Sequence, residues 1–205
     1  MLVGSLILAG GRSQRMGKPK ESLPFGTSTL LGHTSDVLLD CAWPVLVVTR
    51  DQAQQLPPLS LELEVVHDDQ PGKGPLHAIA TGMRKLLASG ELGPQDAIFV
   101  TGCDAPYLTS DTVAFLVNGL GDFQCAVPKT GDTLHPLCAV YRLDCLPAIE
   151  ELLKAGVDSP RTLVEKVKTK VLDEATLRAF DKDLKFLRTC NTHEEYEAAR
   201  RDFRK

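Results

Sequence analysis

The chain has 205 residues, of which 43% are hydrophobic and 24% are charged, and its formal net charge is −4. This length suffices for a substantial core, and we expect residues 1–205 to form one domain. The slightly acidic balance argues against nucleic acid or a membrane surface as a partner, because both favour basic proteins. No apolar run is long enough to span a membrane, and the first residues lack the basic segment of a signal peptide. We therefore expect a cytoplasmic protein.

Apolar runs alternate with helical patterns along almost the whole chain. Strands are expected at residues 2–9, 45–48, 61–66, 97–100, 123–127 and 137–141. Helices are expected at residues 28–41, 75–89, 109–120, 146–155, 161–168 and 192–204, the first of them with Ser28 as its N-cap. Nearly continuous apolar strands separated by helices predict a three-layer α/β fold. Its sheet would be mixed but mostly parallel, with helices on both faces.

The six cysteines are scattered, and no two of them have the C-x-x-C spacing. Such usage is typical of free, buried thiols in a cytosolic protein. It argues against a disulfide framework and against a zinc site.

Residues 6–20 join an apolar run to a glycine pair and four cations: Gly10, Gly11, Arg12, Arg15, Lys18 and Lys20. An apolar run that stops at glycines predicts a buried strand leading into a tight loop. Glycine lets a ligand approach the main chain, and free backbone N–H groups beside cations suit a polyphosphate. A solvated basic turn is the alternative, but the spacing of the cations favours a phosphate site.

Polar segments also follow the later predicted strands, at residues 49–51, 67–75 and 101–106. In a parallel sheet, ligands bind outside the carboxyl ends of the strands. Turn formation alone explains the glycines and prolines of these segments, but it explains Lys20 and Asp104 less well. We therefore expect a ligand site where the strands end.

Two common phosphate-binding motifs are absent. The P-loop pattern fails because five residues separate Gly11 from Gly17 and because Pro19 follows Lys18. The dinucleotide fingerprint G-x-G-x-x-G fails because Gly11 is followed by Arg-Ser-Gln-Arg. Assignment of this chain to the P-loop kinases or to the dehydrogenases therefore lacks its main support.

The loop instead contains L-A-G-G-x-x-x-R-M-G-x-x-K over residues 8–20. This segment closely resembles the loop of the molybdenum cofactor guanylyltransferases, the MobA-like nucleotidyltransferase family. Its members have a Rossmann-like fold of the nucleotide-diphospho-sugar-transferase type. Further segments resemble later motifs of that family in the same order, at residues 67–76, 103–108, 135–137 and 190–192.

The resemblance implies transfer of GMP from GTP to the terminal phosphate of a molybdopterin-type cofactor, with release of pyrophosphate. It implies Mg²⁺ held by Asp104, and Lys20 and Arg15 as catalytic cations on the triphosphate. These residue types suit the reaction. The acceptor phosphate attacks, so the protein must neutralise charge and position the reactants, without a side-chain nucleophile.

The nucleotide-binding residues that the resemblance implies are Leu8, Ala9, Gly10, Gly11, Lys20, Asp68 and Asp104. Main chain at residues 8–10 would frame the base, and Asp68 would accept hydrogen bonds from the base or ribose. Within the family, L-A-G-G accompanies guanylyltransferases, whereas L-A-A-G is usual in related cytidylyltransferases. Gly-Pro-Leu at residues 74–76 points the same way, towards GTP.

Binding of the acceptor is expected from His135, Arg161 and Asn191, although His135 also suits a structural role and Arg161 a solvated helix start. Molybdenum-cofactor delivery proteins are expected as further partners. The sequence departs from the family pattern at Pro19, at His77 and after the second strand, where Thr49 or Arg50 replaces an asparagine.

These departures leave two alternatives open. One is a related nucleotidyltransferase that uses CTP or another phosphorylated acceptor, such as a sugar 1-phosphate. The other is a non-catalytic nucleotide-binding module. The presence of both Lys20 and Asp104 favours catalysis, because a passive binder has less need of a metal carboxylate.

Overall fold

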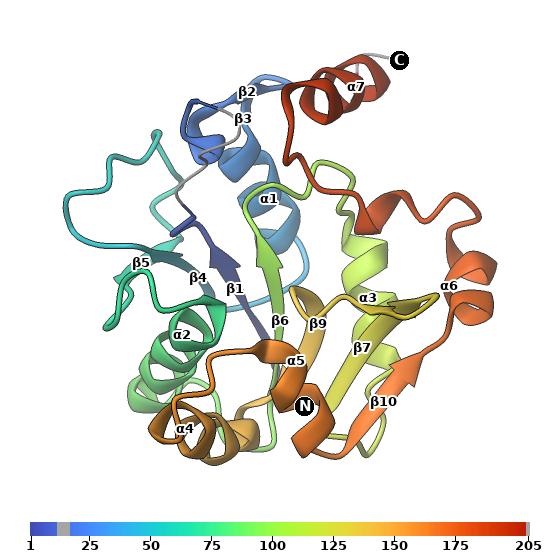
Figure 1. The fold of residues 1–205 in the computed structure, drawn as a ribbon. Helices are drawn as coiled ribbons and strands as arrows, with labels where there is room; N and C mark the ends of the chain where they lie inside the picture. Colours follow the sequence, from blue (N-terminus) through green and yellow to red (C-terminus); the bar gives the residue numbers. More distant parts are fainter. Residues whose placement is uncertain (12–16, 204–205) are drawn as a thin grey trace.

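The computed structural model describes residues 1–11 and 17–203 (Figure 1). Its main element is an eight-stranded sheet in the order β10-β7-β9-β6-β1-β4-β5, with β8 paired to β7. The strands are β1 (Val3–Leu8), β4 (Val45–Thr49), β5 (Glu64–His67), β6 (Ala97–Gly102), β7 (Cys125–Thr130), β8 (Thr133–Leu134), β9 (Cys138–Arg142) and β10 (Thr169–Leu172).

Four adjacent strands, β5, β4, β1 and β6, are mutually parallel, so their carboxyl ends lie along one edge of the sheet. Strand β9 runs antiparallel to both β6 and β7, while β10 is parallel to β7. The predicted mixed, mostly parallel sheet is therefore confirmed. All five residues of β4 are buried, as expected for a parallel strand that is covered on both faces.

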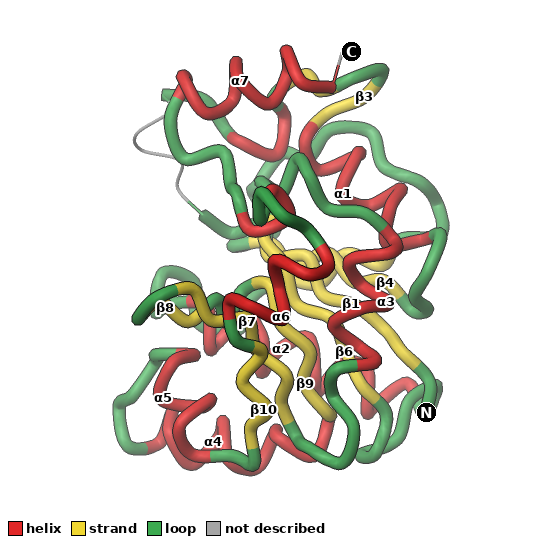
Figure 2. The backbone as a smooth tube through the Cα atoms, turned by 90° about the vertical axis from the view of Figure 1, so that its right-hand side faces the viewer, coloured by secondary structure: helices red, strands yellow, loops and turns green. Residues whose placement is uncertain are grey.

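Helices cover both faces of the sheet. In Figure 2, α4 and α5 lie on one side of the strands, and α1 and α3 lie on the other. Met83, Ile149 and Leu163 pack in the core of the first side, whereas Leu38, Leu116 and Leu177 pack in the core of the second. The helices are α1 (Leu30–Leu39), α2 (Pro75–Ser89), α3 (Ser110–Asn118), α4 (Leu146–Lys154), α5 (Pro160–Lys166), α6 (Glu174–Phe180) and α7 (His193–Phe203).

A third, smaller core joins the two ends of the chain. The hairpin of β2 (Pro24–Phe25) and β3 (Ser28–Thr29) lies beside α7 (Figure 1). Its cluster consists of Leu23, Phe25, Leu30, Cys190, Tyr196 and Ala199. This contact brings the segment after β1 next to residues 190–192. Short 3-10 turns complete the fold: η1 (Lys20–Ser22), η2 (Leu143–Cys145) and η3 (Lys185–Leu187).

The helix predicted at 75–89 is confirmed with both ends, and most other elements differ by one to three residues at an end. One N-cap prediction is wrong. Helix α1 begins at Leu30 and its cap is Thr29, whose hydroxyl accepts from Gly32 N at 3.1 Å. Ser28 instead pairs with Phe25 in the hairpin, which a helical pattern cannot reveal.

The sequence pattern missed β10 and α6. Strand β10 is a four-residue edge strand with two exposed residues, so it has no clear apolar run. Helix α6 has seven residues, and one of them, Leu177, is buried. Elements this short carry too little periodicity to stand out.

Among the described residues, no helix is long and apolar enough to cross a membrane. All six cysteines are free thiols.

Candidate functional site

A cleft of about 600 Å³ lies where the four parallel strands end. It gathers residues from the loops after β1, β4, β5 and β6 and from the start of α2. This is the edge at which α/β sheets bind ligands. The lining residues are Leu8, Gly10, Gly11, Arg50, Asp68, Gly72, Gly74, Pro75, Ala78, Gly102, Asp104 and Leu137.

Lys20 lies beside this cleft, between two oxygen acceptors. Its Nζ donates to Asp104 Oδ2 and to Asn191 Oδ1, both at 2.7 Å. The Lys20 and Asp104 side chains are 15% and 18% exposed, so water screens this ion pair only partly. The three residues come from η1, the β6 loop and the segment before α7. The structure thus brings together three residues that the sequence analysis singled out separately.

The main chain around Asp104 is fixed by its neighbours. Cys103 N donates to Leu8 O at 3.2 Å, and Cys190 N donates to Asp104 O at 2.9 Å. At Gly102, an added Cβ would lie 2.5 Å from Asp104 Oδ1, so any larger residue would displace the carboxylate. Burial raises the pKa of the Cys103 thiol well above its ordinary value, so this cysteine is not an activated nucleophile.

Gly10 packs directly against the main chain of Arg50. An added Cβ at this position would lie 3.2 Å from Arg50 N, so a side chain there would press on backbone that cannot move freely. Within the described residues, neither Gly10 N nor Gly11 N donates a hydrogen bond. Two backbone donors beside the cleft are therefore available to an anionic ligand.

Arg50 adds a cation to the cleft wall. Its Nε donates to Asp51 Oδ2 at 2.8 Å, and its two terminal nitrogens bond to no described residue. Arg50 belongs to the polar segment 49–51, which is expected near a ligand because it directly follows the second strand. No individual site role was predicted for it. Leu137, which comes just before β9, was missed as a lining residue because antiparallel pairing brings it to this edge.

The loop after β5 and the start of α2 form another side of the cleft. Asp68 is held by two hydrogen bonds. Its backbone N–H donates to Thr49 O at 2.8 Å, and its Oδ1 accepts from Gln70 N at 3.0 Å. Gly72 and Gly74 have positive φ values of 83° and 103°, which favour glycine. Among the residues that the structure describes, no side chain caps the first turn of α2, so the N–H groups there remain suited to a negative ligand.

The remaining predicted residues do not line the cleft among the residues that the structure describes. Ala9 is buried, and its carbonyl oxygen accepts from Gln54 Nε2 at 2.7 Å. His135 contacts Thr130 Oγ1 through Nε2 at 2.8 Å, and burial lowers the pKa of its ring. Arg161 is an exposed residue whose Nε bonds to Glu165 Oε1 at 3.1 Å. Arg15 lies outside the described residues.

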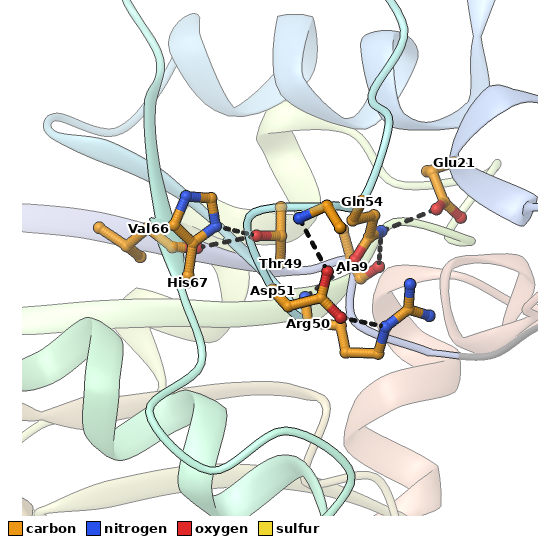
Figure 3. Close-up of polar contacts among 9 residues, drawn as sticks. Ala9, Glu21, Thr49, Arg50, Asp51, Gln54, Val66 and His67 are labelled. Carbon is orange, nitrogen blue, oxygen red and sulfur yellow. Dashed lines mark hydrogen bonds and ion pairs between the residues drawn. The ribbon is translucent and has the colours of Figure 1, made fainter.

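His77 and His67 need no site role. His77, which departs from the family pattern, is not among the residues that line the cleft. His67 ends β5, and its Nδ1 lies 2.7 Å from Thr49 Oγ1 at the end of β4 (Figure 3). This contact joins two strand ends and agrees with a structural role for His67.

A mixed α/β sheet with an anion-suited cleft at the carboxyl ends of its parallel strands defines a nucleotide-binding protein of the Rossmann-like class. The family model of the MobA-like NTP transferase domain matches residues 5–171 of this chain. The chain therefore belongs to the MobA-like NTP transferase family.

Comparisons with individual proteins agree with this family membership. A probable molybdenum cofactor guanylyltransferase of Carboxydothermus hydrogenoformans is 30% identical over 191 residues, which cover 93% of this chain and 91% of the relative. A protein of the same name from Mycobacterium tuberculosis is 36% identical over 167 residues, covering 80% and 79%. The fold is shared with molybdopterin-guanine dinucleotide biosynthesis protein A of Archaeoglobus fulgidus, at a TM-score of 0.78, 21% identity and 98% coverage of both chains.

Proposed function

We propose that this protein transfers GMP from GTP to the terminal phosphate of a molybdenum-pterin cofactor and releases pyrophosphate. The observation that carries the proposal is Lys20, which is held between Asp104 and Asn191 beside a cleft where Gly10 N and Gly11 N have no hydrogen-bond partner among the described residues. The names of the curated relatives supply the donor and the acceptor. The proposal extends their activity to this chain.

In this proposal, Lys20 and the N–H groups of Gly10 and Gly11 hold the triphosphate. Nucleotidyl transfer joins two anions at the α-phosphorus, so fixed positive charge and oriented donors lower the barrier more than any nucleophilic side chain. Arg15 and Arg50 would add further positive charge on the phosphates. Asp68 would accept hydrogen bonds from the base or ribose.

Asp104 suits a divalent cation, for which we propose Mg²⁺. Its Oδ2 is bonded to Lys20, whereas its Oδ1 has no hydrogen-bond partner among the described residues and lies over Gly102. In residues 1–11 and 17–203, no cluster of three or more potential metal ligands occurs. A single carboxylate still fits, because Mg²⁺ is often bound by one carboxylate with substrate phosphates and water. The ion would neutralise charge on the phosphate oxygens.

For the acceptor, we propose that Asn191 and His135 lie nearest to it. Asn191 is bonded to Lys20, and His135 comes two residues before the cleft residue Leu137. Arg161 has weaker support, because its guanidinium is engaged by Glu165 on the surface of α5. A cytoplasmic location and delivery proteins for the molybdenum cofactor are also part of the proposal. The free state of all six thiols supports that location.

The test is release of pyrophosphate with each of the four ribonucleoside triphosphates, with and without the molybdenum-pterin acceptor, in the presence of Mg²⁺. We expect turnover with GTP alone among the nucleotides, and only when the acceptor is present. Turnover restricted to CTP would contradict the choice of guanine. Tight binding of GTP without turnover would instead favour a non-catalytic nucleotide-binding module.

A further inference from the structure

The side chain of Gln54 connects the two described ends of the loop that follows β1. It lies after β4 and makes three hydrogen bonds through its carboxamide (Figure 3). Nε2 donates to Ala9 O and to Glu21 Oε1, both at 2.7 Å. Oε1 accepts from Arg50 N at 2.8 Å. Ala9 precedes the loop and Glu21 follows it, so one amide holds both sides and is itself held by the end of β4.

Glu21 is a buried acid, with 4% of its surface exposed. Within the described part of the chain, Gln54 is the hydrogen-bond partner of its carboxylate. A buried carboxylate costs several kcal/mol unless other groups bond to it. The buried position of the Glu21 carboxylate therefore depends on the donor group of Gln54. This hydrogen bond fixes the place of η1, which contains Glu21.

The bond to Ala9 sets the direction of the next N–H group. The peptide unit between Ala9 and Gly10 is planar and trans, so its carbonyl and its N–H point in opposite directions. Gln54 binds the carbonyl oxygen, and this fixes the Gly10 N–H that has no partner among the described residues. That N–H is one of the two donors beside the cleft.

The bond to Glu21 fixes the other side of the loop. Lys20 directly precedes Glu21 in η1, and its Nζ contacts Asp104 and Asn191. Gln54 is not among the residues that line the cleft, and the hydrogen bonds of its side chain go to Ala9, Glu21 and Arg50. These bonds reach the Gly10 N–H and Lys20 through the main chain, because Ala9 precedes Gly10 and Glu21 follows Lys20.

We infer that Gln54, together with Glu21, is a positioning residue for the nucleotide: it holds the Gly10 N–H and Lys20 at the spacing that the phosphates require. This inference rests on the proposed function for its assay. It does not depend on which nucleotide base the protein selects, because phosphates are common to all four donors.

The test is Gln54→Met, which keeps the length of the side chain and removes its hydrogen bonds. Gln52→Met and Gln55→Met are matched controls, because both glutamines are exposed in the same segment and make no side-chain hydrogen bond to a described residue. We expect Gln54→Met to raise the KM for the nucleotide and to lower kcat/KM about 10- to 100-fold, as small misplacements of positioned groups do. The KM for the acceptor should change less. Both controls should match the wild type.

A second pair of variants separates positioning from loss of folding. Glu21→Gln keeps an oxygen that can accept from Gln54, so we expect a nucleotide KM within about threefold of wild type, whereas Glu21→Met should resemble Gln54→Met. A merely structural role would lower the thermal midpoint and the active fraction but leave the nucleotide KM of the folded enzyme unchanged. If wild type turns over GTP and Gln54→Met has the KM of Gln52→Met, the inference is wrong and the proposed function stands. If wild type uses CTP instead, the guanine assignment fails, and the same KM increase is expected with CTP.

Discussion

At the scale of single residues, the site is built on shared partners. Asn191 is oriented by Thr189, whose Oγ1 accepts from Asn191 Nδ2 at 2.7 Å, and this leaves Asn191 Oδ1 for Lys20. Asp104 offers Lys20 its second acceptor. Because ionised partners make stronger hydrogen bonds than neutral ones, the lysine is well fixed before any ligand arrives. Such prior order lowers the cost of reorganisation during the reaction.

Asp104→Asn tests the charge of this carboxylate with little change of shape, because an amide oxygen can still accept from Lys20. We expect kcat to fall at least about 100-fold, since loss of one electrostatic group at a transferring phosphate costs roughly 3 kcal/mol or more. Binding of GTP should change less. Initial rates of pyrophosphate release at saturating Mg²⁺ give the first quantity, and isothermal titration gives the second. The exposed Asp122→Asn is the matched control, and a rate above half of wild type in Asp104→Asn would refute the metal assignment.

At the scale of elements, α7 holds the end of the chain against the site. Its start is a capping box: Glu195 N donates to Thr192 Oγ1 at 3.2 Å, and Glu195 Oε2 accepts from Thr192 N at 2.9 Å. The same Oε2 accepts from Asn191 N at 2.7 Å. Tyr196 then anchors the helix, through its hydroxyl and Pro24 O, to the hairpin beside η1. A helix cap thus fixes the main chain of Asn191, the partner of Lys20.

Glu195→Ala removes the side chain that bonds to both N–H groups. We expect the free energy of unfolding to fall by about 1 kcal/mol, the usual size of a lost helix cap. The nucleotide KM should also rise, because Asn191 loses its anchor. Denaturant unfolding and steady-state kinetics measure the two effects. Glu194→Ala, an exposed neighbour in the same turn, should leave both unchanged. Equal behaviour of the two variants would show that the capping box does not support the site.

At the scale of the whole molecule, the cleft exists only in the folded state. Its walls come from residues 8 to 137, which four parallel strands and one antiparallel strand bring to the same edge. An unfolded chain cannot gather these groups. A ligand of the cleft must therefore stabilise the folded protein by an amount that grows with the logarithm of its concentration over its Kd.

GTP with Mg²⁺ at about 100 times its Kd should raise the free energy of unfolding by roughly 2.7 kcal/mol. For a chain of this length, we expect the thermal midpoint to increase by about 5–10 °C. Removal of divalent ions with EDTA should reverse most of this increase, and added Mg²⁺ should restore it. Differential scanning calorimetry measures the effect, with ATP as the control nucleotide. An unchanged midpoint at every GTP concentration would rule out the cleft as a GTP site.

The sequence by itself determined the local features of this protein. The apolar run Val45–Val48, the helical spacing of 75–89 and the motif at residues 8–20 predicted buried strands, a long helix and a ligand loop, because each pattern is complete within about fifteen residues. The family followed from motifs of the same short range. The predicted roles of the site residues stay predictions, those of Lys20 and Asp104 as well as those of Arg15 and Arg161.

The tertiary structure decided what depends on distant partners. It brought Asn191 into a hydrogen bond with Lys20, 171 residues away, and Gln54 into a hydrogen bond with Glu21, 33 residues away. It also set the antiparallel course of β9 and the edge position of β10. Hydrogen bonds across such separations correspond to no periodic pattern in the sequence, because they form only when the sheet and its helices pack together. For this reason the sequence could propose groups for the chemistry, whereas only the fold shows what holds them in place.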